Sequence, residues 1–363
     1  MVTNKPRILL LSAYDADSHQ RWRQQLVASQ PSFDWHCLTL PPRHFRWRVR
    51  GNPLSWFNEP LLQGHWDLLV VTSMVDLATL RGLFPALAGI PALLYMHENQ
   101  FAYPVSARQH GSIDPQMVNL YAALSADRVL FNSDWNRISF LRGVQALLDT
   151  LPDAVPSGLV EQLGGKSSVL PVPIDDRHYR SRERAFNASN PHLLWNHRWE
   201  YDKAPERLLY LLDRLAEQGQ SFRLSVVGEQ FRRRPEAMAS LQKRFADQIE
   251  HWGYLASDVY HNLLGSADLV ISTALHDFQG LSMLEAMAGG CLALAPDRLA
   301  YPEYIPAGQC YTSRPDDALA EADEAAAVLM TLLCEPPAPA RPDQWRLSVL
   351  QPHYQQQLES LLR

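Results

Sequence analysis

The sequence predicts an α/β protein built from two doubly wound, Rossmann-like domains that face each other across a cleft. The chain has 363 residues, which is enough for two domains at roughly 150 residues each. Short apolar runs alternate with longer amphipathic segments, a pattern typical of βαβ units and of a parallel sheet covered on both faces. The alternation pauses over 151–190 and then resumes. The pause therefore separates two domains.

In the first half, the predicted strands are short, continuous apolar runs. They span 7–12, 67–72, 92–96 and 128–132. The amphipathic segments between and after them are predicted to be helices, at 19–30, 76–85, 115–126 and 133–150. We assign residues 1–172 to this first domain.

The second half repeats the alternation. Its predicted strands span 192–196, 221–228, 268–273 and 291–295, and its predicted helices span 204–218, 235–250 and 280–288. Residues 316–324 contain five acids and are expected to form the solvated face of a helix. We assign 173–342 to the second domain. A final helix within 343–363 is expected to pack back toward the first domain.

Composition excludes several classes of protein. Hydrophobic residues make up 46% of the chain, which excludes disorder as the main state. No apolar run approaches the roughly 18 residues of a membrane span, and we expect no stable membrane association.

The four cysteines lie far apart and form no C-x-x-C pair, so neither a zinc site nor a disulfide framework is predicted. A cytoplasmic location is expected. The net charge of -6 argues against indiscriminate nucleic-acid binding.

Residues 276–287 follow the predicted strand 268–273 and carry the first candidate site. Gly280 stands where a helix is expected to begin, and a helix N-terminus suits a phosphate group. Glu285 is expected to accept hydrogen bonds from ribose hydroxyls, and Asp277 to hold hydroxyls of a second group. An alternative is that Asp277 is a capping residue and Glu285 a surface acid. The remaining predicted donor-binding residues of this loop are Phe278, Gln279 and Leu281.

Residues 196–203 follow the strand 192–196 and carry two cations, Arg198 and Lys203. A planar guanidinium and an ammonium on a loop that enters a helix can clamp a diphosphate. The alternative is two solvated charges. Gly228 and Glu229 end the next strand, where a glycine allows a ligand to approach the backbone closely. We see no D-x-D metal motif, and we predict no metal and no cofactor besides a nucleotide-sugar donor.

In the first half, polar residues follow the strand 92–96. His97 is expected to hydrogen-bond a donor sugar or an incoming acceptor, and Glu98, Asn99 and Gln100 to orient it. The alternative is a capping loop with a satisfied histidine. A second loop ends the first strand and contains Ser18 and His19, where Ser18 is expected to cap the first helix. Asn132 and Ser133 are expected to cap the helix after the fourth predicted strand, where a structural and a functional role fit equally.

The segment 35–58 contains four arginines and no acid. If 41–51 is extended, Arg46, Arg48 and Arg50 share one face, with Trp47 on the other. Arginines contact phosphates and aromatic rings stack on unpaired bases, so these residues and Arg43 are candidate RNA contacts. The alternative is a solvated edge strand.

These motifs resemble known families. The second half resembles the donor-binding domain of GT-B glycosyltransferases of family 4. In that family an E-x7-E motif, here Asp277 and Glu285, contacts the donor sugar and ribose, and the pair Arg198 and Lys203 contacts the diphosphate. Asp277 departs from the usual Glu by one methylene. The combination of SAYDADSH, PPRHFRWRVR, HENQ-x-x-YP, NHRWEYDK, HWGYL and HDFQG resembles the tRNA-queuosine α-mannosyltransferase family over about 7–306.

The resemblance implies an enzyme of tRNA modification. Such an enzyme transfers mannose from GDP-mannose, with retention of configuration, to the cyclopentenediol of queuosine in the anticodon loop of tRNA-Asp. Two alternatives remain open: a GT-B enzyme that uses another sugar nucleotide and a lipid, glycan or small-molecule acceptor, and a non-catalytic nucleotide- or RNA-binding module. A nicotinamide dehydrogenase is disfavoured, because G-x-G-x-x-G does not follow the first strand.

Overall fold

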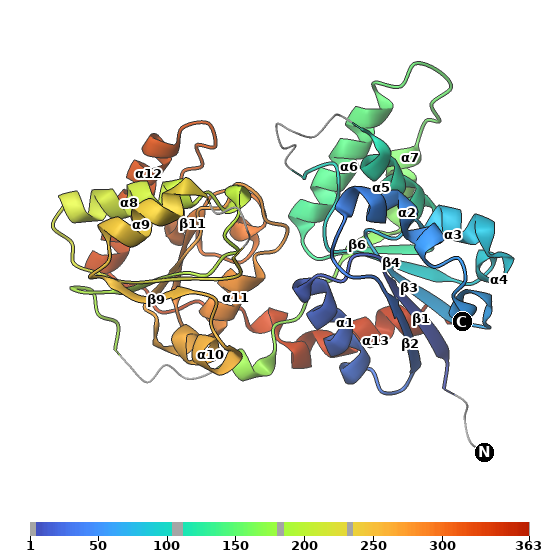
Figure 1. The fold of residues 1–363 in the computed structure, drawn as a ribbon, viewed down its shortest axis with the longest axis horizontal. Coiled ribbons are helices and arrows are strands. Elements are labelled where there is room, and N and C mark those ends of the chain that lie inside the picture. Colours follow the sequence, from blue (N-terminus) through green and yellow to red (C-terminus); the bar gives the residue numbers. More distant parts are fainter. Residues whose placement is uncertain (1–4, 104–111, 180–184, 231–234, 363) are drawn as a thin grey trace. The chain divides into compact units, whose positions relative to one another are not determined.

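The computed structural model describes residues 5–103, 112–179, 185–230 and 235–362. The chain divides into two compact units (Figure 1). Unit 1 contains 1–173 and 348–363, and unit 2 contains 174–347. Pro104, the last residue of the HENQ-x-x-YP motif, lies outside the described residues.

Unit 1 is built on a parallel sheet of six strands in the order β2-β1-β3-β4-β5-β6. The strands are β1 (Arg7–Ser12), β2 (Asp34–Thr39), β3 (Leu68–Thr72), β4 (Ala92–Met96), β5 (Arg128–Phe131) and β6 (Ser167–Val169). The helices are α1 (Asp17–Ser29), α2 (Phe45–Ser55), α3 (Leu77–Leu83), α4 (Pro85–Ala88), α5 (Asp114–Ser125), α6 (Asp134–Leu148), α7 (Leu159–Gly165) and α13 (Leu347–Glu359). The central strands are buried along their whole length, because helices cover both faces of a doubly wound sheet.

The segment 41–51 is not extended, contrary to the alternation argument, because most of it lies in α2. Pro53 has no N–H for the carbonyl of Val49, but the side-chain amide of Asn52 donates to that carbonyl (3.3 Å) and to the carbonyl of Met74 (3.1 Å). Val49 is buried in the core. The helix is therefore held in place by a buried amide and an apolar anchor.

Forming a helix changes which arginines share a face. Arg48 is buried and donates to the hydroxyl of Ser55 at 3.0 Å. Arg50 is exposed and pairs with Asp76 at 2.9 Å. The shared face that an extended segment would give Arg46, Arg48 and Arg50 is therefore absent from this helix, and Arg48 contacts Ser55 from a buried position.

The last helix of the chain packs in unit 1. Tyr354 of α13 is buried, and Trp22 of α1 donates its indole N–H to the Tyr354 hydroxyl at 3.0 Å. Arg128 of β5 donates to the side chain of Gln357 at 2.6 Å. Within the described ranges, no helix is both long and apolar enough to cross a lipid bilayer.

Unit 2 contains a second parallel sheet, in the order β12-β11-β10-β7-β8-β9. Its strands are β7 (His192–Trp195), β8 (Arg223–Val227), β9 (Ile249–Gly253), β10 (Leu269–Ile271), β11 (Leu292–Pro296) and β12 (Cys310–Tyr311). Its helices are α8 (Pro205–Glu217), α9 (Glu236–Arg244), α10 (Ser257–Ser266), α11 (Leu281–Ala288) and α12 (Ala318–Cys334). Apolar residues of α8, α9 and α12 cover one face of the sheet, and those of α10 and α11 cover the other.

The predicted helix 235–250 is too long. The structure ends α9 at Arg244 and begins β9 at Ile249. Residues of β9 pair with β8 as the edge strand of the sheet. The ladder hydrogen bonds to β8 therefore place 249–253 in a strand, although the sequence alone predicts that the helix continues to residue 250.

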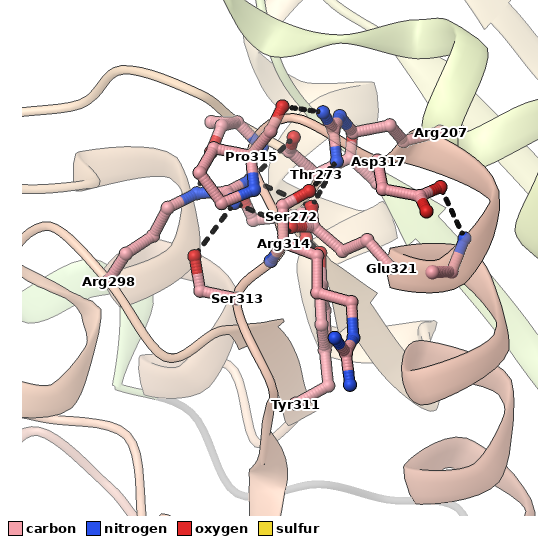
Figure 2. A network of polar contacts seen from close by, with 12 residues as sticks. Arg207, Ser272, Thr273, Arg298, Tyr311, Ser313, Arg314, Pro315, Asp317 and Glu321 are labelled. Atoms are coloured by element: carbon pink, nitrogen blue, oxygen red, sulfur yellow. Dashed lines mark hydrogen bonds and ion pairs between the residues drawn. The ribbon is translucent and has the colours of Figure 1, made fainter.

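The acidic segment 316–324 is only partly solvated. Asp316, Asp317 and Asp323 are exposed, but Glu321 is 1% exposed. Figure 2 shows the Glu321 carboxylate between two guanidinium groups: it pairs with Arg298 at 2.7 and 2.9 Å and with Arg207 at 2.9 Å. Because the buried Arg207 and the half-buried Arg298 flank it, this acid lies inside the unit, contrary to the expectation of a solvated face.

Replacing Glu321 by Ala is expected to lower the free energy of unfolding by about 3–5 kcal/mol, since it leaves two guanidinium groups without their shared anion. Asp323→Ala, on the exposed side of the same helix, is the matched control and is expected to cost under about 1 kcal/mol. Urea unfolding followed by fluorescence measures both. Equal losses for the two variants would show that the buried carboxylate has no special role.

Candidate active site

The residues of the second-half motifs meet where the topology of the unit 2 sheet reverses. From β7 the chain continues through β8 to β9 on one side, whereas β10, on the other side of β7, leads to β11 and β12. The carboxyl ends of β7 and β10 are therefore neighbours. Ligands of open α/β sheets bind at such a switch point. The loop with Lys203 follows β7, and the loop with Asp277 follows β10.

Lys203 lies at the centre of this arrangement. Its ammonium donates to the carbonyl of His276 at 2.6 Å and lies 3.4 Å from Asp277 and 3.3 Å from Asp202. The side chain is 9% exposed. A buried ammonium needs such partners, so the alternative of a solvated Lys203 is wrong.

Backbone contacts connect the same two loops. The hydroxyl of Thr273 donates to the carbonyl of Lys203 at 2.8 Å, and the amide of Leu275 donates to the carbonyl of Asp202 at 2.8 Å. Arg298 in turn donates from Nε to the carbonyl of Ala274 at 2.9 Å (Figure 2 shows the position of Arg298). The position of Lys203 relative to Asp277 is thus determined by backbone as well as by charge.

The carboxylate of Asp277 contacts both the backbone N–H of Gly280 and the ammonium of Lys203. Its Oδ1 accepts the amide N–H of Gly280 at 2.9 Å, just before α11 begins. Burial opposes ionisation of this carboxyl, but the nearby Lys203 ammonium and the Gly280 N–H favour the anion and lower its pKa to about 2. The carboxylate is therefore charged at neutral pH.

Arg198 differs from Lys203 in its surroundings. Its side chain is 48% exposed and forms an ion pair with Glu200 at 3.2 Å. Burial raises the pKa of Glu200, although the Arg198 cation opposes that shift. The two predicted clamp residues thus combine one enclosed ammonium with one guanidinium that solvent can reach.

Glu285 is enclosed in α11, with 4% of its surface exposed. Its Oε2 accepts the hydroxyl of Tyr260 at 3.1 Å, and Asn196 donates its amide to the same tyrosine oxygen at 3.0 Å. The alternative of Glu285 as a surface acid is therefore wrong. The carboxylate lies instead in a polar cluster formed from three elements.

Asn196 and His197 were not among the predicted site residues. Among the described residues, Asn196 Oδ1 and His197 Nε2 are buried atoms without a hydrogen-bond partner. Burial, together with the Lys203 cation, lowers the pKa of His197 to about 4, so the imidazole is neutral. The sequence does contain a feature that indicates a site role for both residues, because they directly precede Arg198 at the end of a predicted strand. Tyr260 gave no such signal.

The two glycines of this site are required by close packing within the protein. Gly228 has φ +148°, and a Cβ there would lie 2.0 Å from the carbonyl oxygen of His197. Gly280 has φ +78°, and a Cβ there would lie 2.3 Å from the Tyr304 hydroxyl. Both positions suit glycine alone. Glycine at position 228 thus allows the backbone of His197, rather than a ligand, to lie close to it.

The other predicted donor residues are mostly enclosed. Phe278 and Gln279 are buried, and the ring of Phe278 contacts His276 edge to face. Leu281 is half-buried. Glu229 is exposed, and its carbonyl accepts the amide N–H of Trp199 at 2.9 Å.

In unit 1, His97 follows β4 and stacks on His19 of α1 with ring centroids 4.1 Å apart. Burial and the neighbouring His19 lower the pKa of His97 well below its ordinary value. Among the described residues its Nε2 is a buried atom without a hydrogen-bond partner. The His97 imidazole is therefore neutral, and its Nε2 makes no hydrogen bond to a described residue.

The loop that carries His97 is held by asparagines. Asn132 donates to the carbonyl of His97 at 2.8 Å, and Asn136 donates to the carbonyl of Met96 at 2.9 Å. Asn99 is fully buried and donates to Asn136 Oδ1 at 2.8 Å. Asn99 therefore orients the loop from inside. Glu98 and Gln100 are half-buried.

Of the two predicted helix caps, one is correct. The hydroxyl of Ser133 accepts the amide N–H of Asn136 at 3.0 Å at the start of α6. Ser18 is exposed within α1, whose N-cap position is Ala16 and has no side-chain cap. The cap predicted for Ser18 is wrong, because α1 begins at Asp17, two residues earlier than that role requires.

Comparison with known proteins connects these sites to a family. A family model described as tRNA-queuosine alpha-mannosyltransferase N-terminal matches residues 7–174. A second model, glycosyl transferases group 1, matches residues 177–333. The tRNA-queuosine alpha-mannosyltransferase of Drosophila melanogaster is 33% identical over 318 residues, which cover 85% of this chain and 84% of the relative.

Solved structures share the fold at low sequence identity. Sucrose-phosphate synthase from Thermosynechococcus elongatus has a TM-score of 0.72 and 15% identity, and the match covers 98% of this chain and 99% of that chain. Anabaena HepE in complex with UDP has a TM-score of 0.64 and 13% identity, with 98% and 100% covered. The fold is thus of the GT-B glycosyltransferase type. Taken with the family matches along both halves, these findings show that the chain belongs to the tRNA-queuosine alpha-mannosyltransferase family.

Proposed function

We propose that this protein is a retaining glycosyltransferase that moves mannose from GDP-mannose to the cyclopentenediol of queuosine in the anticodon loop of tRNA-Asp. The glycosyl transferases group 1 match supports the reaction class, and the name of the Drosophila relative supports the sugar and the acceptor. The observation that carries the proposal is the enclosed Lys203 ammonium beside Asp277 at the switch point of unit 2. A tRNA acceptor also supports a cytoplasmic location.

On the donor side, Arg198 and Lys203 would stabilise the negative charge that develops on the leaving diphosphate. The carboxylate contacts of Lys203, at 3.3 and 3.4 Å, are longer than the about 2.8 Å of a tight charged hydrogen bond. An ammonium has three N–H donors, so a phosphate oxygen can take the place of one carboxylate. Two cations then neutralise the diphosphate, and the reaction as proposed uses no metal.

The polar groups around Lys203 would hold the sugar and the ribose. Asp277 is ionised and can accept hexose hydroxyls, and Glu285 lies one helical turn into α11, where it can accept ribose hydroxyls. Asn196 Oδ1 supplies a further buried acceptor, and His197 Nε2 can accept or donate a hydrogen bond according to its tautomer. Because the sequence motifs offer no convincing carboxylate nucleophile, we propose same-face attack, in which the departing phosphate takes the acceptor's proton.

On the acceptor side, the surface around α2 would bind tRNA. Trp47 and Phe57 are 50% and 51% exposed, and Arg43, Arg46 and Arg50 are exposed beside them. Guanidinium groups and exposed rings match the phosphates and unstacked bases of a single-stranded loop. His97 and His19, with Ser18 nearby, would contact the acceptor at the ends of β4 and β1.

The proposal is tested with the purified full chain, tRNA that contains queuosine, and a panel of sugar nucleotides. Nucleoside mass spectrometry is expected to show one hexose on queuosine with GDP-mannose and none on tRNA that lacks queuosine. No added mass with any donor would contradict the acceptor. Transfer from a different sugar nucleotide would contradict the donor.

Lys203→Ala is expected to lower the transfer rate by at least about 10²-fold, since it removes a donor aimed at developing charge. Lys243→Ala, an exposed position on α9 of the same unit, is the control and should keep the wild-type rate. Initial rates of hexose transfer measure both, with circular dichroism to confirm folding. A folded Lys203→Ala variant with wild-type turnover would rule out the clamp.

The double variant Arg43→Ala, Arg46→Ala is expected to weaken tRNA binding and to reduce the slope of log affinity against log salt by about 2, or about 1 for each phosphate that an arginine no longer neutralises. The exposed Arg142 of α6 provides a control substitution to Ala. Filter binding at several salt concentrations gives both quantities. An unchanged slope would place the tRNA-binding surface elsewhere on the protein.

A further inference from the structure

We infer that unit 2 contains a binding site for a divalent transition-metal ion, with zinc the best fit, formed by His192, Glu250 and His251. One ligand atom from each of these residues lies within 4.8 Å of the other two. His192 opens β7, and the other two residues lie in β9. The inference does not depend on the proposed glycosyl transfer.

The strand between them brings the donors together. Ser225 of β8 has its hydroxyl oxygen 2.8 Å from His192 Nε2 and 3.2 Å from His251 Nδ1. The two imidazoles thus converge on one point above β8. That point lies on the sheet face where Leu194 and Val227 pack against α10 and α11, because alternate residues of a strand share a face.

A β-bulge accounts for the third donor. Adjacent residues of a regular strand point to opposite faces, so Glu250 and His251 could not both face one ion. In the β8–β9 pair, Leu224 lies opposite Ile249 and Ser225 opposite His251, which leaves Glu250 as an extra residue. Such a bulge redirects side chains. The Glu250 carboxylate consequently lies 3.5 Å from His192 Nε2.

The distances suit a tetrahedral ion. Zinc bonds of about 2.1 Å to nitrogen and oxygen place neighbouring donors about 3.4 Å apart in a tetrahedron. The Glu250–His192 separation of 3.5 Å and the Ser225–His251 contact of 3.2 Å are close to that value, and the Ser225–His192 contact of 2.8 Å is shorter. Two imidazoles and one carboxylate form a zinc donor set that leaves the fourth position for a water or for the serine hydroxyl.

The charges around the site favour a cation. Arg223 holds Glu250 through Oε1 at 2.9 Å, and this leaves Oε2 toward the histidines. The buried Asp268 accepts the backbone N–H of His192 at 2.8 Å and lies 3.7 Å from Arg223. Two carboxylates against one guanidinium leave a net charge of -1 beside the two imidazoles. The Glu250 side chain is 37% exposed, which gives an ion access from solvent.

The position predicts a structural role. His192 is the first residue of β7, whereas Asn196 and the residues of the proposed donor site follow the end of that strand. An ion on His192 and β9 would connect β7 to β9 across β8 at the edge of the sheet. Bound metal should therefore stabilise the folded chain without taking part in transfer.

The test uses the full chain after removal of metals with a chelator. Because the exposed thiols of Cys37 and Cys334 also bind zinc, both are replaced by Ser in every protein compared. Titration calorimetry with zinc is expected to show one site per chain, and the melting temperature should rise with zinc. Cobalt(II), as a spectroscopic probe, should give the absorption bands of a tetrahedral site.

His251→Ala is expected to weaken zinc binding by at least about tenfold and to abolish the tetrahedral cobalt spectrum. Glu250→Gln tests the carboxylate with little change in shape and should also weaken zinc binding. His353→Ala, an exposed position on α13, is the control. Circular dichroism of the metal-free variants confirms folding. Absence of stoichiometric zinc binding, or binding unchanged in both variants, would overturn the inference.

Discussion

The enclosed ammonium of Lys203 is the constraint on which the rest of unit 2 depends. A charged group with so little contact with water is stable only beside anions and carbonyls. Asp202, Asp277 and the carbonyl of His276 supply these partners, and they come from the loops after β7 and β10. The requirement to pair one cation therefore holds together two segments that are far apart in the sequence. The same ammonium keeps the carboxyl group of Asp277 ionised.

A second buried ion cluster supports the first. Glu321 is enclosed between Arg207 of α8 and Arg298. Arg207 lies in the helix that begins just after Lys203, and Arg298 donates to the carbonyl of Ala274, just before the Asp277 loop. Removing one member of such a cluster leaves the others charged and buried, which is costly. The cluster therefore connects the folding stability of the unit to the geometry of the loops with Lys203 and Asp277.

Unit 1 holds its corresponding loop with neutral groups. Amides of Asn132 and Asn136 bond the carbonyls of His97 and Met96. Burial lowers the pKa of His97 and keeps its imidazole uncharged, so its unused nitrogen can accept or donate a hydrogen bond according to its tautomer. A diphosphate calls for positive charge and a sugar or nucleoside hydroxyl calls for neutral polar groups. The local chemistry of the two loops therefore differs, because unit 2 encloses a cation and unit 1 encloses neutral polar groups.

The sequence by itself determined the central strands, such as β1 and β4, the alternation of strands and helices in each half, and the loops with Lys203 and Asp277, because burial along a strand depends on neighbouring residues. Only the tertiary structure decided that β9 is a strand, that 45–55 is a helix, that Glu321 is inside, and that His192 meets Glu250 and His251. Each of these depends on partners distant in the chain. The strand β9 pairs with β8, and Asn52 of the helix bonds the carbonyl of Met74. Glu321 pairs with two arginines, and a bulge opposite β8 brings Glu250 and His251 to the same side. Local pattern reports how much of a segment is buried, but pairing of charges, amides and edge strands is decided by which residues the fold places opposite them.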